Sequence, residues 1–150
     1  MHLEKIITQK SVNDLAYKIV GSAIEVHKEL GPGLLESVYE KILKYELESS
    51  GLFVESQKLI PINYKGKSVD CDLRLDLLVE DLVIVELKAV ELMIPLFQAQ
   101  LLTYLKLLNK PKGLLINFNS DNISKSLIPL VTEEFSKLPK ELIFLVILVP

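Results

Sequence analysis

The segment VIVELKAVE, residues 83–91, carries an acid and a base inside an otherwise apolar stretch. Glu86 and Lys88 are two residues apart, so in a β-strand both side chains point to the same face. Carboxylate oxygens bind divalent cations, and an ammonium group beside them can address a water molecule or a phosphate. The pair is therefore a candidate for metal-assisted hydrolysis.

A second carboxylate lies on the preceding strand of a predicted hairpin. If burial sets the register, one apolar face is formed by Leu73, Leu75, Leu77, Val79, Val83, Val85, Leu87 and Ala89. A three-residue connection, Glu80 to Leu82, then places Asp76 directly opposite Glu86, with Cβ atoms roughly 4.5–5.5 Å apart. Two carboxylates at this spacing raise each other's cost of ionisation unless a cation is present.

Two interpretations of this face remain open from the pattern. In one, Arg74 and Lys88 neutralise Asp76 and Glu86 on a half-exposed sheet surface, as in an ordinary lattice of charges. In the other, the carboxylates hold a divalent cation and Lys88 addresses the water or phosphate beside it.

Further polar residues lie on the helices that flank these strands. Gln100 and Tyr104 are four apart within AQLLTYLKLL and so share one face of an apolar helix. They either satisfy each other or reach toward the sheet. Glu36 begins a helix after Gly31-Pro32-Gly33, where the helix dipole favours a carboxylate in any case.

The positions of apolar residues predict an α/β fold with a mixed sheet. We expect helices over residues 11–30, capped by Ser11, over 34–50 and over 95–109. A three-stranded meander is expected over 52–64, 68–79 and 82–90, and a buried strand over 113–118. The order is helix, helix, three strands, helix, strand. Residues 123–131 are expected as a strand and 132–138 as a short helix.

The chain of 150 residues predicts one domain, with a core over about 12–119 and a C-terminal extension over 120–150. The net charge of −3 gives no sign of a broad basic surface, so contact with nucleic acid would be local or assisted by a metal. The single Cys71 fits a reducing compartment and is expected as a small core residue. Without a signal-peptide pattern, a cytoplasmic protein is expected.

The most apolar run is LIFLVILVP, residues 142–150. It is about half as long as a membrane span requires, so no membrane contact is expected. It suits a terminal core strand or a segment that faces a partner, including a second copy in a homodimer.

In this order, Glu36, Asp76, Glu86-x-Lys88 and Gln100-x-x-x-Tyr104 resemble the PD-(D/E)xK nuclease superfamily, which has a restriction-endonuclease-like core. The Gln-x-x-x-Tyr element is similar to its RecB-like branch. The segments GLLESVY, RLDLLVED, VIVELKAVE and AQLLTYLK resemble more narrowly the GxxExxY protein family, whose name is the spacing of Gly33, Glu36 and Tyr39. The resemblance covers residues 16–119.

The resemblance implies a role for each matching residue. Asp76, Glu86 and Glu36 would ligate Mg²⁺ or Mn²⁺, with help from the backbone carbonyl of Leu87. Lys88 would orient or activate the attacking water. Gln100 would steady that water or Lys88, and Tyr104 would contact a phosphate or Gln100. The implied reaction is hydrolysis of phosphodiester bonds in nucleic acid, with DNA favoured over RNA.

Some residues depart from the superfamily's pattern. Leu75 stands where its proline would precede Asp76. His27 is either an additional ligand or a polar residue near a helix end. The fold is also reused without catalysis, so a noncatalytic binding or assembly module is the alternative to a nuclease. A glycosidase is disfavoured because basic residues crowd the carboxylates and tryptophan is absent.

Overall fold

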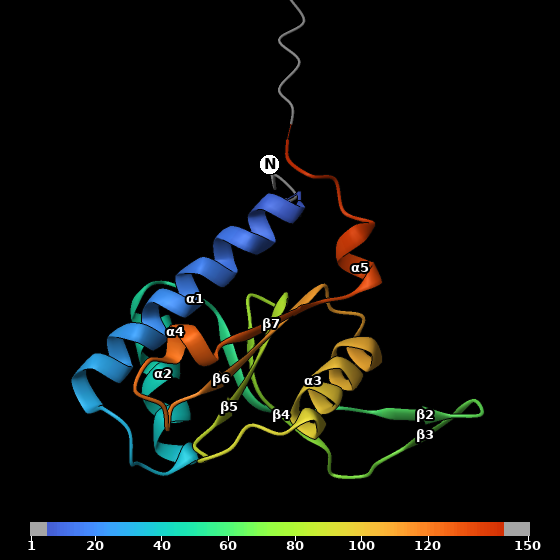
Figure 1. Ribbon diagram of the computed structural model, residues 1–150. Helices are drawn as coiled ribbons and strands as arrows, with labels where there is room; N and C mark the ends of the chain where they lie inside the picture. The colour runs from blue at the N-terminus through green and yellow to red at the C-terminus, as the bar shows by residue number, and fades with distance from the viewer. Residues whose placement is uncertain (1–5, 143–150) are drawn as a thin grey trace, which may run out of the picture.

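The computed structural model describes residues 6–142, and its elements alternate much as the sequence predicts (Figure 1). The helices are α1 (Gln9–Leu30), α2 (Glu36–Ser49), α3 (Pro95–Leu108), α4 (Ile123–Ser126) and α5 (Glu133–Ser136). The strands are β1 (Val54–Leu59), β2 (Ile62–Tyr64), β3 (Lys67–Val69), β4 (Arg74–Val79), β5 (Val83–Lys88), β6 (Lys112–Asn117) and β7 (Ile128–Val131). The predicted mixed α/β class is confirmed.

Five strands form one sheet in the order β1-β4-β5-β6-β7. Among the strands of residues 6–142, only β5 and β6 are parallel neighbours, joined by the crossover helix α3, and the other neighbours in this sheet are antiparallel. This makes β5 a central strand that is paired on both sides, which agrees with its nearly complete burial.

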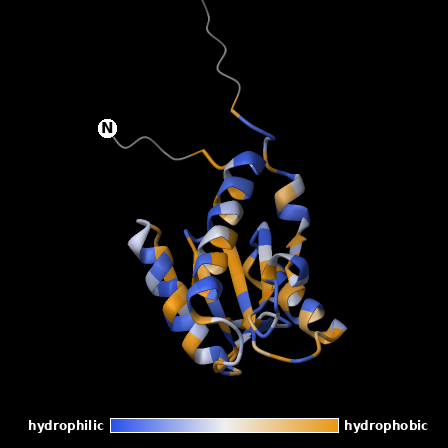
Figure 2. Cartoon of the chain, turned by 60° about the vertical axis from the view of Figure 1, so that its left-hand side comes forward, coloured by the Kyte–Doolittle hydropathy of each residue, from blue (hydrophilic) through white to orange (hydrophobic). Residues whose placement is uncertain are grey.

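Each face of the sheet is covered by helices and has its own core. On one face α1 and α2 pack over Leu77, Val85 and Leu114, and on the other α3 packs over Leu78, Ile84 and Leu115. Figure 2 shows hydrophobic residues concentrated on the central strands and on the inner sides of the helices. The strand bearing Glu86 and Lys88 therefore lies between two layers and not on an open sheet surface.

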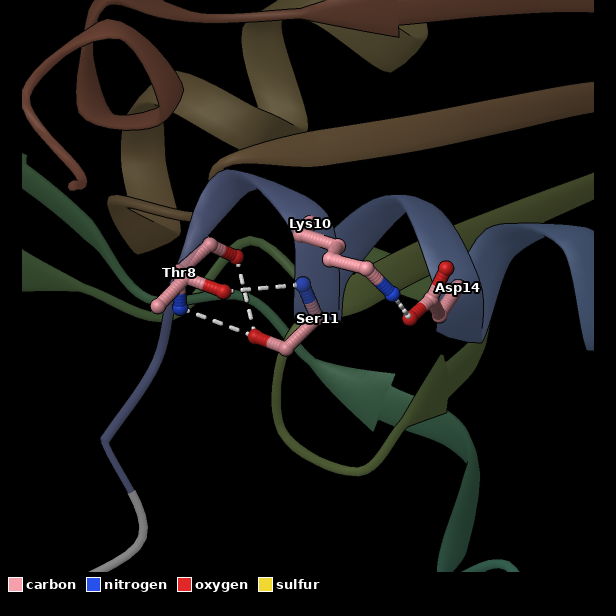
Figure 3. Close-up of polar contacts among 4 residues, drawn as sticks. All are labelled: Thr8, Lys10, Ser11 and Asp14. Atoms are coloured by element: carbon pink, nitrogen blue, oxygen red, sulfur yellow. Dashed lines mark hydrogen bonds and ion pairs between the residues drawn. The ribbon is translucent and has the colours of Figure 1, made fainter. Parts of the chain in front are cut away.

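Helix α1 starts earlier than expected. Thr8, and not Ser11, is its N-cap: the Thr8 hydroxyl accepts from the Ser11 N–H at 3.0 Å, and the Ser11 hydroxyl accepts from the Thr8 N–H at 2.8 Å (Figure 3). This reciprocal pair satisfies two N–H groups that a helix start leaves free. Ser11 was predicted as the cap because it directly precedes the first apolar residue of the helix. The helix in fact begins about one turn before Val12, at Gln9, so Thr8 is the capping residue.

The first turn of α1 also binds the chain near its other end. The N–H groups of Gln9 and Lys10 donate to the carbonyls of Pro139 and Lys140 at 2.8 and 2.9 Å. The Gln9 side chain adds bonds to the carbonyls of Phe135 and Leu138. The segment after α5 thus completes the cap of α1.

The predicted strands 52–64 and 68–79 are each divided into two. Their distal parts, β2 and β3, form a separate two-stranded hairpin, whereas β1 and β4 stay in the main sheet (Figure 1). The meander β1-β4-β5 is confirmed in this shorter form. Ile60 is buried in the core, and its N–H donates to the Leu73 carbonyl at 2.7 Å, so the main sheet ends there.

The register between β4 and β5 agrees with the prediction, but the face assignment does not. Residues 80–82 connect the strands, and Leu77 pairs with Val85, so Asp76 comes opposite Glu86. However, Leu73 and Leu75 pack on the α3 side, whereas Leu77 packs against α1 and α2. The inward face of β4 therefore changes at Asp76, where its pairing with β5 ends.

Other local expectations also need correction. Cys71 is exposed in the segment between β3 and β4 and is not a core residue. Residues 123–126 form α4 and not part of a strand, so only 128–131 are extended. Of the apolar run 142–150, residues 143–150 lie outside the described part of the chain, and its expected role stays untested. No helix within residues 6–142 is long and apolar enough to cross a membrane.

Candidate active site

The loop before α2 places Glu36 at the first position of that helix. Gly33 has φ of +106°, a conformation that L side chains rarely adopt. Tyr39, one turn into α2, is fully buried and stacks on Phe118 with ring centroids 4.6 Å apart. Its hydroxyl donates to the Gly31 carbonyl and accepts from the Leu34 N–H at 3.1 Å. The Gly33, Glu36, Tyr39 spacing is therefore a folded unit that aims Glu36 at the sheet.

Asp76 and Glu86 meet where β4 and β5 separate. The Asp76 N–H donates to Glu86 Oε1 at 3.0 Å, and the Leu87 N–H donates to Asp76 Oδ2 at 2.9 Å. These side-chain acceptors replace the backbone carbonyls of a regular ladder. The two predicted carboxylates are thus brought together, in the gap between two strands.

The electrostatics of this gap are unfavourable for negative charge. Burial raises the pKa of Glu86 to about 9, and the neighbouring Asp76 adds to this rise. Burial and Asp76 likewise raise the pKa of Glu36, while Lys88 opposes the shift. A cation in the gap would relieve this repulsion.

Two residues that the sequence analysis missed complete the acidic side. Glu40, one helical turn after Glu36, has its pKa raised to about 7, first by burial and then by Asp76. Gln57 of the edge strand donates to Glu40 Oε1 at 2.6 Å and to Asp76 Oδ1 at 3.4 Å. Both line an open pocket of about 370 Å³ with Leu35, Glu36 and Ser37. The four-residue spacing of Glu36 and Glu40 was the available signal for Glu40.

Lys88 and Tyr104 approach the gap from the α3 side. Lys88 Nζ lies 4.4 Å from the centroid of the Phe97 ring, a cation–π distance. Burial raises the pKa of the half-buried Tyr104, and the charges of Glu86 and Asp76 add to the shift. Gln100, one turn before Tyr104, is exposed, and its side chain has no hydrogen bond to any described residue. Among the predicted site residues, Gln100 is therefore the one with the fewest contacts to the gap.

The ordinary lattice of charges does not describe this face. Arg74 pairs with Asp72 at 3.0 Å and donates to the Gln57 carbonyl. Among the ion pairs of residues 6–142, none joins Arg74 to Asp76 or Lys88 to Glu86. Among residues 6–142, no lysine or arginine forms an ion pair with Asp76 or Glu86, and Lys88 acts on Glu86 from a greater distance.

The donor chemistry suits a hard divalent cation, but the ligands are not closed around one. Carboxylate oxygens from Asp76, Glu86 and Glu36 are what Mg²⁺ and Mn²⁺ prefer. In the part of the chain that is described, no three His, Cys, Asp or Glu side chains stand close enough together to hold a metal. Binding by three of these carboxylates therefore requires their side chains to move closer together. His27, which the sequence offered as a possible additional ligand, packs beside Phe118. Its buried Nε2 has no hydrogen-bond partner among residues 6–142.

The sequence profile of the PD-(D/E)XK nuclease superfamily matches residues 13–128, most of the chain. The chain belongs to this superfamily. PD-(D/E)XK nucleases act on nucleic acid and generally use divalent metal ions. Glu86-Leu87-Lys88 lies within the matched range and has the (D/E)-x-K form of the superfamily's name, and Leu75, not a proline, precedes Asp76. Comparisons with curated proteins and with solved structures each return no match.

Proposed function

We propose that this PD-(D/E)XK protein is a metal-dependent nuclease that hydrolyses phosphodiester bonds of DNA. The observation that carries the proposal is the meeting of Asp76 and Glu86 in the gap between β4 and β5, with Glu36 on one side and Lys88 on the other. Buried carboxylates that repel one another form a site whose charge is completed by a cation.

The metal site that we propose is formed by Asp76 and Glu86, with Glu36 as a third ligand, direct or through water. The Leu87 carbonyl is a further candidate. Its N–H donates to Asp76, and the N–H and C=O of one strand residue point to the same side, so this carbonyl faces the same gap. Mg²⁺ or Mn²⁺ bound there would act as Lewis acid and lower the pKa of a bound water.

The remaining side chains would position the substrate and the water. Lys88 supplies a fixed positive charge at the gap, suited to the charge that develops on the phosphate. Tyr104 offers a hydroxyl donor to a phosphate oxygen, and Gln57 holds Glu40 beside Asp76. Gln100, being exposed, is assigned to contact with the bound nucleic acid or to Lys88 after a change of rotamer.

We also assign the chain to the GxxExxY family and to the RecB-like branch of the superfamily. The supporting features are Gly33 at positive φ, the hydrogen bonds of Tyr39, and the position of Gln100 and Tyr104 on the helix beside the site.

A noncatalytic module is favoured by one observation. Asp76 and Glu86 each accept one main-chain hydrogen bond, so each carboxylate has a hydrogen-bond partner without a metal. In this case the carboxylates would be structural, and nucleic acid would be bound but not cut.

The deciding experiment is cleavage of a panel of single- and double-stranded DNA and RNA with Mg²⁺ or Mn²⁺. Metal-dependent cleavage that is lost in Asp76→Ala and Lys88→Ala, but kept in Asp72→Ala, supports the nuclease. Asp72 is a suitable control because it is exposed and pairs with Arg74 outside the gap. Absence of cleavage together with absence of Mn²⁺ binding by calorimetry would refute the enzyme and leave the noncatalytic module.

A further inference from the structure

The β2–β3 hairpin extends away from the body of the protein on the side of α3 (Figure 1). Its cross-strand pairs are Ile62 with Val69, Asn63 with Ser68 and Tyr64 with Lys67. All of these residues except the half-buried Ile62 are exposed. A two-stranded hairpin is only marginally stable by itself in water. Because most of its residues are exposed, packing in the core does not explain why this hairpin is present.

We propose that this hairpin is a DNA-binding ribbon that enters the major groove of the duplex beside the bond to be cut. The inference rests on the proposed nuclease function and adds the substrate class, double-stranded DNA, and the element that grips it.

The hairpin is directly continuous with the two strands β1 and β4 beside the site. Its base is closed by the bond from the Ile60 N–H to the Leu73 carbonyl, and Ile60 is buried against α3. Immediately below this bond, β1 carries Gln57 and β4 carries Asp76. A groove that holds the hairpin therefore lies near the strands that carry the carboxylates.

The hairpin tip carries the charge that the acidic gap lacks. Lys65 and Lys67 flank Gly66 in the turn, and Lys65 Nζ lies 5.4 Å from the centroid of the exposed Tyr64 ring. The two acids of this segment, Asp70 and Asp72, are at its base, where Asp72 is paired with Arg74. In a chain of net charge −3, this tip is complementary to a phosphate backbone.

The shape of the hairpin selects duplex DNA over duplex RNA. The major groove of B-form DNA admits a two-stranded ribbon, whereas that of A-form RNA is too deep and narrow. Nine residue steps lead from Gln57 to Gly66 in the turn, so the tip lies at most about 31 Å from the site. This is less than one helical turn of about 34 Å, so the ribbon and the carboxylates can contact one duplex together.

Binding by the full chain to labelled DNA duplex, to RNA duplex of the same sequence and to single-stranded DNA tests the proposal. Fluorescence anisotropy without divalent metal, between about 50 and 200 mM salt, gives affinity and its salt dependence. Lys65→Ala/Lys67→Ala is expected to weaken DNA-duplex binding by at least about tenfold. The negative slope of the logarithm of the association constant against the logarithm of the salt concentration should become shallower by about 1.8. Lys65→Arg/Lys67→Arg should keep the affinity.

The matched control is Lys18→Ala/Lys28→Ala, which removes the same charge from the exposed face of α1. It should leave binding within about twofold, because these lysines contact no duplex in the proposed mode. Thermal unfolding establishes that each variant is folded, and Lys65→Gln/Lys67→Gln repeats the test with longer neutral side chains.

The ribbon proposal would be overturned if the hairpin variants bound DNA duplex as tightly as the wild type, or if the control variant on α1 lost as much affinity as they did. It would also be overturned if the hairpin lysines mattered equally for RNA duplex, or if the hairpin variants changed self-association without changing DNA affinity. If the wild type binds no duplex, the ribbon fails. The nuclease is judged separately, from metal-dependent cleavage of any substrate and its loss in Asp76→Ala.

Discussion

The Asp76 N–H donates to Glu86 Oε1 at 3.0 Å, at the position where β4 and β5 would otherwise continue their backbone pairing. A glutamate side chain thus stands where a neighbouring strand would supply a carbonyl. This hydrogen bond holds the Glu86 carboxyl group in a defined position, although burial disfavours its negative charge. A divalent cation can compete with the Asp76 N–H for the same oxygen.

Divalent metal should stabilise the protein through this pair. At about 100 times its dissociation constant, Mn²⁺ is expected to add about 2.7 kcal/mol, which raises Tm by roughly 5–10 °C. The shift should be lost in Asp76→Ala and in Glu86→Gln and kept in Asp72→Asn. Differential scanning fluorimetry with and without Mn²⁺ measures it, and an equal shift in all four proteins would point to binding elsewhere.

Without metal, stability should fall as pH rises. Glu36, Glu40 and Glu86 have raised pKa values, so the folded state holds their protons more tightly than the unfolded state. The loss begins near pH 4.5 and continues toward about 7 for Glu40 and about 9 for Glu86. Glu86→Gln should remove much of it and stabilise the protein at about pH 8 by about 1–3 kcal/mol. Urea unfolding at several pH values checks the sign, and a rise in stability with pH would contradict it.

Removing the Tyr39 hydroxyl should loosen the loop that aims Glu36. Tyr39→Phe loses the bonds to Gly31 and Leu34 but keeps the stack on Phe118. We expect a loss of about 1–2 kcal/mol in urea unfolding and weaker Mn²⁺ binding, although no carboxylate is altered. Tyr17→Phe on the exposed side of α1 is the control. Unchanged metal affinity in a destabilised Tyr39→Phe would show that Glu36 is held by other contacts.

Lys88 is expected to serve the reaction more than the metal. Lys88→Met keeps the alkyl chain against Phe97 and removes the charge, so cleavage should fall about 100-fold or more while Mn²⁺ affinity is retained or increased. Lys106→Met, on the exposed side of α3, should cleave normally. Calorimetry and cleavage rates together separate the two roles, and loss of Mn²⁺ binding in Lys88→Met would contradict the assignment.

Two glycines should respond oppositely to alanine. A Cβ on Gly113 of β6 would lie 2.9 Å from Leu101 Cδ1 and 3.0 Å from Leu105 Cδ1, so Gly113→Ala should cost about 1–3 kcal/mol. Gly21 lies within α1 with nothing near its Cβ position, so Gly21→Ala should stabilise by about 0.5–1 kcal/mol. Urea unfolding compares them directly. Equal effects would mean that α3 does not pack on β6 as closely as described.

The register of Asp76 and Glu86 was predictable because two local features determine it. Alternating apolar residues fix which side chains are buried, and the three-residue connection 80–82 leaves one pairing that satisfies both strands. That argument holds as far as Leu77 and then fails. It assumes an unbroken ladder, and the ladder ends at the acids themselves, which is why Leu75 was placed on the wrong face.

The contacts of Gln57 and the separation of the β2–β3 hairpin from the main sheet could not be predicted from local pattern. Gln57 has φ of +52°, which its residue type does not suggest, and this kink accompanies its contact with Glu40 and Asp76. The hairpin continues the alternation of the strands around it. The end of the main sheet at Ile60 depends on packing against α3, which is distant in sequence.

The attachment of Pro139 and Lys140 to the first turn of α1 has a consequence for synthesis. The side chain of Gln9 bonds a carbonyl 129 residues later, at Leu138. At about 5–20 residues per second, the ribosome makes these partners roughly 6–26 s apart. Helix α1 is therefore made well before the partners that complete its cap, so its first turn should reach full stability only after residues 138–140 have been made and have folded onto it.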